Sequence, residues 1–281
     1  MPSDAVLVTG AGGYVGRHVV TALADRGHRV IATVRPGSRS DVDARAEVLP
    51  VDVLADDLDL AAFGDLPGTV VHLAWQDGFT HNAPSHMLNL SAHYRFLDRL
   101  VEAGVPRLAV LGTMHEVGYW EGAVTAETPT KPLSLYGIAK DALRGAAFTA
   151  WAPKTELQWL RCYYIFGDDR RNSSVFTRLL EAAERGDATF PFTTGKNLYD
   201  FIDVAELGRQ IAVVATAPGV TGIINCSTGE PRSLREQVEW FIADRGLDIR
   251  LEIGAFPDRP YDSPGTWGDA TLIREVMARY A

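Results

Sequence analysis

Apolar and polar residues alternate along this chain in two distinct rhythms. Short apolar runs rich in Val, Ile and Leu occupy positions 5–8, 29–34, 47–51, 70–74 and 107–112. Segments 17–26 and 85–103 lie between such runs and have the apolar spacing of a helix. Apolar strands that alternate with helices predict a parallel sheet with helices on both faces. The pattern therefore predicts a doubly wound α/β fold.

The first strand runs directly into a glycine turn. Residues 6–16 read VLVTGAGGYVG, in which Gly10, Gly13 and Gly16 are three residues apart. A side chain at the first would obstruct the turn, at the second would keep a pyrophosphate from the backbone, and at the third would hold the helix off the strand. Bare amides and the positive end of the helix then favour an anion. We therefore predict a Rossmann-type dinucleotide site, with loop contacts from Gly10, Gly12, Gly13, Tyr14, Val15 and Gly16.

The end of the second strand bears on which dinucleotide is bound. An NAD-selective site has an acidic residue there, which holds the ribose hydroxyls. This chain instead has Arg35, with Ser38 and Arg39 just beyond it. Because a guanidinium can grip a 2′-phosphate through forked donors, the sequence favours NADP(H), with NAD(H) as the alternative. Both arginines could also be solvated loop charges. After the third strand, Asp52 could meet the adenine amino group and Val53 could pack on its ring.

Four histidines lie between residues 70 and 103. His72 lies inside an apolar run, so we expect it to be a packed core residue. His81, His86 and His93 do not have the spacing of metal ligands, because seven helical residues separate the last two by about 10 Å. We expect these three on the surface, and we predict no metal site.

The second chemical signal is the sequence YGIAK at residues 136–140. On a helix, residues four apart share a face, so the ammonium group of Lys140 can sit beside the phenol of Tyr136. A nearby cation favours the phenolate and lowers the tyrosine pKa toward the working range. Thr113 ends the preceding strand, and its hydroxyl could hold a substrate oxygen for Tyr136. These three residues are the predicted catalytic set for reducing a carbonyl.

Composition and charge narrow the range of partners. The chain has 281 residues, a net charge of −9 and a pI near 5.3, which argues against binding nucleic acid or anionic membranes. No basic segment precedes the first apolar run, and no apolar stretch reaches the roughly eighteen residues of a membrane helix. Cys162 and Cys226 suit reduced thiols. We therefore expect a cytoplasmic protein with a small substrate.

Together these motifs resemble the extended short-chain dehydrogenase/reductase family of nucleotide-sugar epimerases, dehydratases and reductases. The resemblance rests on TGAGGYVG from residue 9, DV from 52, HLA from 72, YGIAK, and LRCYYIFG from 160. It continues through YDFIDVAELG from 199, GIINCSTGE from 222 and DRPYDSP from 258. It therefore covers nearly the whole chain.

The resemblance implies two lobes. Residues 1–164, with returning segments near 199–228, would form the dinucleotide-binding Rossmann domain. Residues 165–198 and 229–281 would form a smaller α/β lobe for the nucleotide sugar, braced by Asp200 and Asp203. Helices 85–103 and 135–151 would pair with those of a second copy in a homodimer.

The resemblance also implies roles for single residues. Tyr136 would be the acid, Lys140 would lower its pKa and bind the nicotinamide ribose, and Thr113 would be the third member. Asn89 would support the active-site helix and a water, and Arg259 would bind the diphosphate. Further cofactor contacts would be Leu73, Ala74, Trp75, Asn89 and Tyr163. The substrate contacts would be Met114, His115, Glu116, Tyr164, Asn172 and Arg259.

The chain departs from the family pattern after the fifth strand, where residues 112–120 read GTMHEVGYW. Counting back from Gly118 puts Thr113 in the catalytic position, whereas counting back from Val117 puts Met114 there. Thr113 is preferred because methionine cannot orient an oxygen. Elsewhere, Tyr164 replaces a substrate-contacting asparagine, with Asn172 nearby, and Tyr199 replaces an arginine.

The reaction class is chosen among the family's activities. Dehydratases have an Asp-Glu pair where this chain has Met114 and His115, which disfavours a dehydratase. Epimerases need tightly held NAD, which the preference for NADP(H) disfavours. The chain most resembles the dTDP-4-keto-6-deoxyhexose reductases, which implies hydride transfer to C4 with Tyr136 as the acid. The alternatives are an epimerase or dehydratase, a reductase of a non-nucleotide carbonyl such as a flavonoid or aldehyde, and a non-catalytic NADP(H)-sensing regulator.

Overall fold

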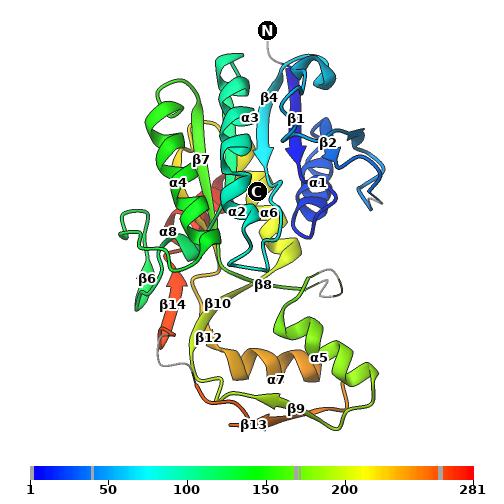
Figure 1. Cartoon of the computed structure of the whole chain (residues 1–281), viewed down its shortest axis with the longest axis vertical. Coiled ribbons are helices and arrows are strands. Elements are labelled where there is room, and N and C mark those ends of the chain that lie inside the picture. Colours follow the sequence, from blue (N-terminus) through cyan, green and yellow to red (C-terminus); the bar gives the residue numbers. More distant parts are fainter. Residues whose placement is uncertain (1–2, 39–40, 168–169, 171, 259–261) are drawn as a thin grey trace.

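The computed structural model describes residues 3–38, 41–167, 170, 172–258 and 262–281. A large lobe holds both the first strand and the last helix, and a smaller lobe lies at one end of it (Figure 1). In the part of the chain so described, no helix is long and apolar enough to cross a membrane.

A seven-stranded parallel sheet forms the centre of the large lobe, in the order β11-β7-β5-β4-β1-β2-β3. Its strands are β1 (Ser3–Thr9), β2 (Val30–Val34), β3 (Glu47–Pro50), β4 (Pro67–His72), β5 (Arg107–Thr113), β7 (Glu156–Cys162) and β11 (Gly222–Cys226). The strand order reverses at β1, so connections leave the ends of β1 and β4 in opposite directions. Such a switch point is where open α/β sheets bind their ligands. The predicted doubly wound fold is confirmed.

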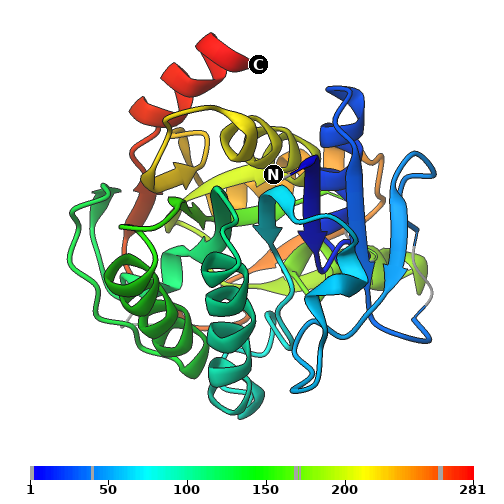
Figure 2. The same cartoon turned by 90° about the horizontal axis from the view of Figure 1, so that it is seen from above.

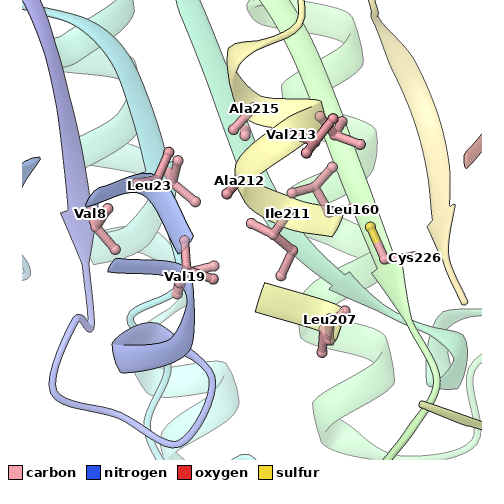
Figure 3. Close-up of a cluster of buried hydrophobic side chains, with 14 of the residues drawn as sticks. Val8, Val19, Leu23, Leu160, Leu207, Ile211, Ala212, Val213, Ala215 and Cys226 are labelled. Carbon is pink, nitrogen blue, oxygen red and sulfur yellow. The ribbon is translucent and has the colours of Figure 1, made fainter. Parts of the chain in front are cut away.

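Helices cover both faces of this sheet, as the view from above shows (Figure 2). One layer holds α1 (Gly16–Asp25), α6 (Val204–Thr216) and α8 (Thr271–Tyr280), and the other holds α2 (Ser85–Leu88), α3 (Leu90–Glu102) and α4 (Leu135–Ala150). Because strand side chains alternate, Val8 packs toward the first layer and Leu7 toward the second. Figure 3 shows the first core, where Val19 of α1 lies across from Ile211 of α6.

The predicted helix over 85–103 is two helices that meet at Asn89. The ψ angle of Asn89 is −6°, whereas an α-helix has about −42°, so the turn opens there. The predicted end is confirmed: Gly104 follows α3 with a φ of 93°, a left-handed conformation that favours glycine. The break places α2 against the first turns of α4, which brings this region to the candidate site.

The smaller lobe has its own aromatic core. It contains α5 (Val175–Glu184), α7 (Leu234–Asp244) and the parallel pair β9 (Thr189–Phe192) and β13 (Arg250–Ile253). Phe176, Phe201 and Phe241 are buried between the helices and the strand β10. The lobe therefore buries apolar surface independently of the large sheet.

A second sheet joins the two lobes. Its order is β12 (Pro231–Ser233), β10 (Leu198–Asp203), β14 (Gly265–Gly268) and β6 (Gly122–Val124), with β8 (Tyr164–Phe166) also paired to β10. Short 3₁₀ helices η1 (Leu60–Phe63) and η2 (Met114–Glu116) complete the described elements. The buried carboxylate of Asp200 accepts hydrogen bonds from the main chain of Gly229 and Gly268, at 2.9 and 3.1 Å. Asp203 caps α6. Both residues brace the junction, as the sequence predicted.

The chain's last helix differs from the sequence-based boundary. Residues 229–281 were assigned to the smaller lobe, but α8 adds Ile273 and Val276 to the core of the large lobe. These two residues are three apart, so they form one apolar stripe that packs against α6 and β11. For this segment the predicted boundary was wrong.

The two cysteines are closer than their separation in sequence suggests. Cys162 and Cys226 are register partners on β7 and β11, and both are buried free thiols. Burial raises the pKa of the Cys162 thiol to about 12, so it is neutral at physiological pH.

Candidate active site

The glycine turn fits a cofactor phosphate. Gly10 has a φ of 67°, and a Cβ there would lie 2.7 Å from the Cα atom of Ala74. A Cβ on Gly16 would lie 2.1 Å from the carbonyl oxygen of Gly10, so α1 can begin against the turn only with glycine. Gly13 is exposed, and a Cβ on it would come within 3.0 Å of the same oxygen. These bare backbone positions form a cradle that a side chain would fill, and it opens at the switch point of the sheet.

The rest of the loop links the two lobes. The hydroxyl of Tyr14 donates to the carbonyl oxygen of Gly167 at 2.7 Å, where the chain enters the smaller lobe. Val15 precedes α1 and provides no side-chain cap. Gly12 is partly exposed. The loop is therefore tied to the start of the lobe that the sequence assigned to the sugar.

The residues predicted to bind the adenosine part of the cofactor are only partly open to it. Arg35 follows β2 and is exposed, and its carbonyl oxygen accepts a hydrogen bond from the Ser38 hydroxyl at 2.6 Å. Arg39 lies outside the described residues. Asp52 is exposed, and its carboxylate accepts the main-chain hydrogen of Leu54 at 3.0 Å. Val53 is buried in the core, so its side chain is not open to a nucleobase here.

The three predicted catalytic residues come together. Thr113 ends β5, and the short helix η2 that follows it packs against α4, where the ring of His115 lies 5.9 Å from that of Tyr136. Lys140 is one turn further along that helix. Gly137 allows this approach, because a Cβ there would lie 2.4 Å from the carbonyl oxygen of His115. The geometry suits a proton exchanged at the phenol and an oxygen held by the threonine.

The electrostatics of Tyr136 differ from the sequence-based expectation. Burial raises its pKa above the usual range, and the nearby Thr113 hydroxyl only partly opposes this. Lys140 is 1% exposed, and its ammonium donates to the carbonyl oxygen of Leu111 at 2.7 Å. Burial lowers the pKa of Lys140 to about 8. The pKa of Tyr136 is therefore raised by burial of the phenol, and not lowered as the sequence predicted.

Four aromatic rings surround the ring of Tyr136. Their centroids lie 5.2 to 6.1 Å from it, and they belong to Trp75, His81, His86 and His115. The main-chain N–H of Tyr136 also donates to the carbonyl oxygen of His81 at 2.9 Å. His81 and His86 come from the segment after β4, and no spacing in the sequence indicated that it reaches α4. Burial lowers the pKa of His115 to about 4, which leaves it neutral near pH 7.

Trp75 links the histidines to the catalytic lysine. Its ring stacks on His93 with 4.3 Å between centroids, and its Nε1 donates to Nδ1 of His86 at 3.0 Å. The ammonium of Lys140 lies 3.8 Å from the Trp75 ring centroid. His86 and His93 are each 1% exposed, so the prediction that they lie on the surface was wrong. They pack inward because both meet the Trp75 ring.

His72 is a core residue, as predicted, with polar partners. Its Nδ1 lies 2.8 Å from the hydroxyl oxygen of Thr9, and its Nε2 lies 2.9 Å from Nδ1 of His93. The Thr9 hydroxyl oxygen also accepts the main-chain hydrogens of Leu73 and Ala74. Since that oxygen already accepts twice, its own hydrogen points to His72. This chain of bonds holds the end of β4 beside the glycine turn. Within the described ranges, no group of three or more His, Cys, Asp or Glu residues is placed to hold a metal.

The residues after Thr113 face inward more than expected. Met114 is 7% exposed and packs with Val117 and Tyr163, so it is not placed to orient a substrate oxygen. Glu116 is fully buried, and its carboxylate bonds within the protein. The prediction that Glu116 contacts the substrate therefore disagrees with the structure, because no part of its side chain is open. His115 is only partly buried and faces Tyr136.

Three other residues predicted to contact the cofactor or substrate make hydrogen bonds within the protein. The amide of Asn89 donates to the side chain of Gln76 at 3.2 Å. The hydroxyl of Tyr163 donates to Asn225 at 3.0 Å, within the protein interior. The side-chain oxygen of Asn172 accepts from the main chain of Ser174 at 2.8 Å, and Ser174 is the residue that caps α5.

Two aromatic residues pack against each other where β8 and β10 pair. The rings of Tyr164 on β8 and Tyr199 on β10 lie 4.2 Å apart. The structure thus pairs the two positions at which the sequence departs from the family's asparagine and arginine. Arg259, the predicted diphosphate ligand, lies outside the described residues.

Comparisons with known proteins agree with this architecture. Residues 6–227 match the model of the NAD dependent epimerase/dehydratase family. A dTDP-6-deoxy-L-talose 4-dehydrogenase (NAD(+)) from Aggregatibacter actinomycetemcomitans is 43% identical over 94% of this chain and 98% of the relative. A UDP-glucose 4-epimerase from Corynebacterium glutamicum is 27% identical over 95% of this chain and 86% of the relative.

A solved structure shows the same fold with ligands. MoeE5 in complex with UDP-glucose and NAD superposes with a TM-score of 0.80 and 26% identity, over 98% of this chain and 93% of the other.

Proposed function

The chain belongs to the NAD dependent epimerase/dehydratase family, and from that premise we propose that it is a nicotinamide-dependent 4-ketoreductase of a dTDP-linked 4-keto-6-deoxyhexose. The observation that carries the proposal is the position of three residues. Tyr136 and Lys140 lie one turn apart on α4, and the ammonium of Lys140 donates to Leu111 of β5, the strand that Thr113 ends. The name of the 43% identical relative supports both the nucleotide sugar and C4 as the reacting carbon.

The chain's own residues would handle the proton and the oxygen. A bound nicotinamide supplies the hydride that C4 gains, and the glycine cradle at Gly10, Gly13 and Gly16 fits its pyrophosphate. Tyr136, protonated because burial raises its pKa, gives its proton to the oxygen that becomes the C4 hydroxyl. Thr113 orients that oxygen through its hydroxyl. In the opposite direction the same phenol oxygen accepts the proton.

The direction of net reaction is part of the proposal. The relative is named as a dehydrogenase, whereas a phenol that keeps its proton favours reduction. Because a single site catalyses both directions, the ratio of cofactor forms and substrates decides the net flux. We propose reduction of the 4-keto sugar as the net reaction.

The choice of dinucleotide is a separate question. Arg35 led the sequence to favour NADP(H), but the comparisons name NAD and give that preference no support. Arg35 is exposed and its guanidinium has no acidic residue next to it in the chain. We therefore propose NAD(H) as the working cofactor, with Arg35 and Ser38 as the described residues at this position that could bind a 2′-phosphate.

The experiment is a cofactor oxidation assay with purified protein. dTDP-4-keto-6-deoxyglucose and its C5 epimer are offered separately with NADH and with NADPH, and the sugar product is identified by NMR. Turnover of either sugar with a C4 alcohol as product is the expected result. Tight cofactor binding without turnover of either sugar would contradict the proposal and leave the sensing regulator.

An epimerase is the second candidate, because the Corynebacterium relative carries that name. An epimerase interconverts two sugars without net consumption of the dinucleotide. Incubation of a dTDP-hexose with catalytic NAD, followed by NMR, separates the two activities. We place the reductase first because the relative of higher identity is named as a dehydrogenase.

We also propose that the protein forms a homodimer through α3 and α4. An apolar groove lies between these helices and is lined by Met87, Leu90, Tyr94 and Ala146. Sedimentation equilibrium at several concentrations tests the association, and a monomer throughout would contradict it.

A further inference from the structure

We propose that Glu116 is a positioning residue that acts through Thr113, holding the threonine in place for the phenol of Tyr136. This inference rests on the proposed function. It concerns a carboxylate that the sequence assigned to the sugar and that the structure places beneath the catalytic set.

The carboxylate of Glu116 is tied on both oxygens. Its Oε1 accepts the main-chain hydrogen of Thr113 at 2.7 Å and the Nε1 hydrogen of Trp159 at 2.9 Å. Its Oε2 lies 3.5 Å from the guanidinium of Arg161 and 3.8 Å from that of Arg144. The side chain is 0% exposed, so these four contacts take the place of water around the carboxylate.

The same residue pair fixes the threonine hydroxyl. Thr113 and Glu116 form a reciprocal capping box around η2, and the Thr113 hydroxyl oxygen accepts the main-chain hydrogen of His115 at 3.3 Å. A hydroxyl has one hydrogen to donate. Because its oxygen accepts from His115, that hydrogen remains to be donated to the substrate oxygen of the proposed reaction. The carboxylate of Glu116 thereby holds the backbone of Thr113, and the main chain of η2 holds the threonine hydroxyl.

The neighbouring strands are adapted to this buried charge. Trp159 and Arg161 are two apart on β7, so both side chains leave the same face of the sheet. A Cβ on Gly112 would lie 2.1 Å from Nε1 of Trp159 and 2.8 Å from Oε1 of Glu116. Only glycine at 112 therefore lets the indole reach the carboxylate. A buried charge is costly unless it is paired, and here its pairing is built around the residue that holds the catalytic hydroxyl.

A double-mutant cycle tests whether Glu116 acts through Thr113. The variants are Glu116→Gln, Thr113→Ala and the two combined, with kcat, KM and the cofactor dissociation constant measured for each. Glutamine keeps the size and one acceptor oxygen but loses the charge that faces Arg161. We expect Glu116→Gln to lower kcat about tenfold while KM and cofactor binding stay within about twofold.

The decisive result is the combined variant. If Glu116 works through Thr113, adding Glu116→Gln to Thr113→Ala lowers kcat no further, because the group that it positions is gone. Losses that multiply would overturn the inference and indicate a general structural role. Glu102→Gln, which removes an exposed carboxylate paired with Lys154, is the matched control and leaves kcat unchanged.

A second variant tests the same inference in case Glu116→Gln folds poorly. Trp159→Phe keeps the carboxylate and removes one of its donors, and we expect a smaller loss of kcat that also disappears in the Thr113→Ala background. A loss that persists there would overturn the inference. The assay separates this inference from the proposed function. A wild-type protein that turns over neither sugar refutes both, whereas an active protein with multiplicative losses refutes only the role of Glu116.

Discussion

The ammonium group of Lys140 lies 3.8 Å from the centre of the Trp75 ring. The same ammonium donates to the carbonyl oxygen of Leu111 on β5, and Trp75 rests on His93. Burial beside an indole and one carbonyl disfavours the charged form of Lys140 and lowers its pKa to about 8. This relationship makes the charge of the catalytic lysine sensitive to pH near neutrality.

We expect reduction to weaken as pH rises through about 8. Lys140 is protonated below that pKa, whereas Tyr136 keeps its proton throughout because its own pKa is raised. The value of kcat/KM for the keto sugar should be flat below the midpoint and fall about tenfold per pH unit above it. A flat profile from pH 6 to 10 would contradict a required Lys140 charge. Lys154→Gln, at an exposed lysine, should leave the midpoint unchanged.

Protein stability should respond to the same lysine in the opposite sense. An unfolded lysine keeps its proton to about pH 10.4, whereas folded Lys140 releases it near 8. The unfolded state therefore binds more protons between these values, so this residue's contribution to the free energy of unfolding rises with pH there. Urea unfolding of wild type and Lys140→Met at pH 7 and 9.5 measures it. The stability advantage of Lys140→Met should be smaller at the higher pH.

Removing the indole should shift the kinetic midpoint. A desolvated cation–π contact is worth about 2 kcal/mol, and one pKa unit corresponds to about 1.4 kcal/mol. Trp75→Leu should therefore move the decline in kcat/KM about one pH unit lower. Trp240→Leu, which changes an exposed tryptophan of the smaller lobe, provides the comparison. An unchanged midpoint in Trp75→Leu would show that the indole does not support the charge.

Replacing the phenol should abolish most turnover. Tyr136→Phe keeps the ring and its aromatic neighbours but removes the proton donor, so we expect kcat to fall about 10²- to 10⁴-fold. Cofactor affinity, followed by fluorescence titration, should be retained. Tyr119→Phe removes an exposed hydroxyl that contacts Glu121 and should have no effect. Turnover within a few fold of wild type would exclude Tyr136 as the acid.

The glycine turn should not tolerate a methyl group at its end. In Gly16→Ala the new Cβ would meet the carbonyl oxygen of Gly10 at 2.1 Å, and both atoms belong to backbone that cannot yield cheaply. We expect lost cofactor binding and a destabilisation of about 1–3 kcal/mol. Gly145→Ala in α4 meets no atom within 4 Å and should be neutral or stabilising. Calorimetric titration with NADH and thermal unfolding report the two effects.

Much of this protein could be read from local sequence. The first five strands of the central sheet, the glycine turn and the helix that carries Tyr136 and Lys140 follow from spacing, because side-chain direction repeats regularly along strands and helices. His72 was also placed correctly in the interior. These features depend on neighbours in the chain, which the sequence displays directly.

Tertiary structure decided what those residues touch. Glu116 turns inward because Trp159 and Arg161 arrive from another strand, and His86 is buried because Trp75 lies over it. α8 packs on the large lobe although its sequence follows the smaller one. The pKa of Tyr136 is raised, against the expectation from the sequence, because the fold removes water from the phenol. Burial and long-range contacts are set by the whole fold, so local spacing in the sequence does not predict them.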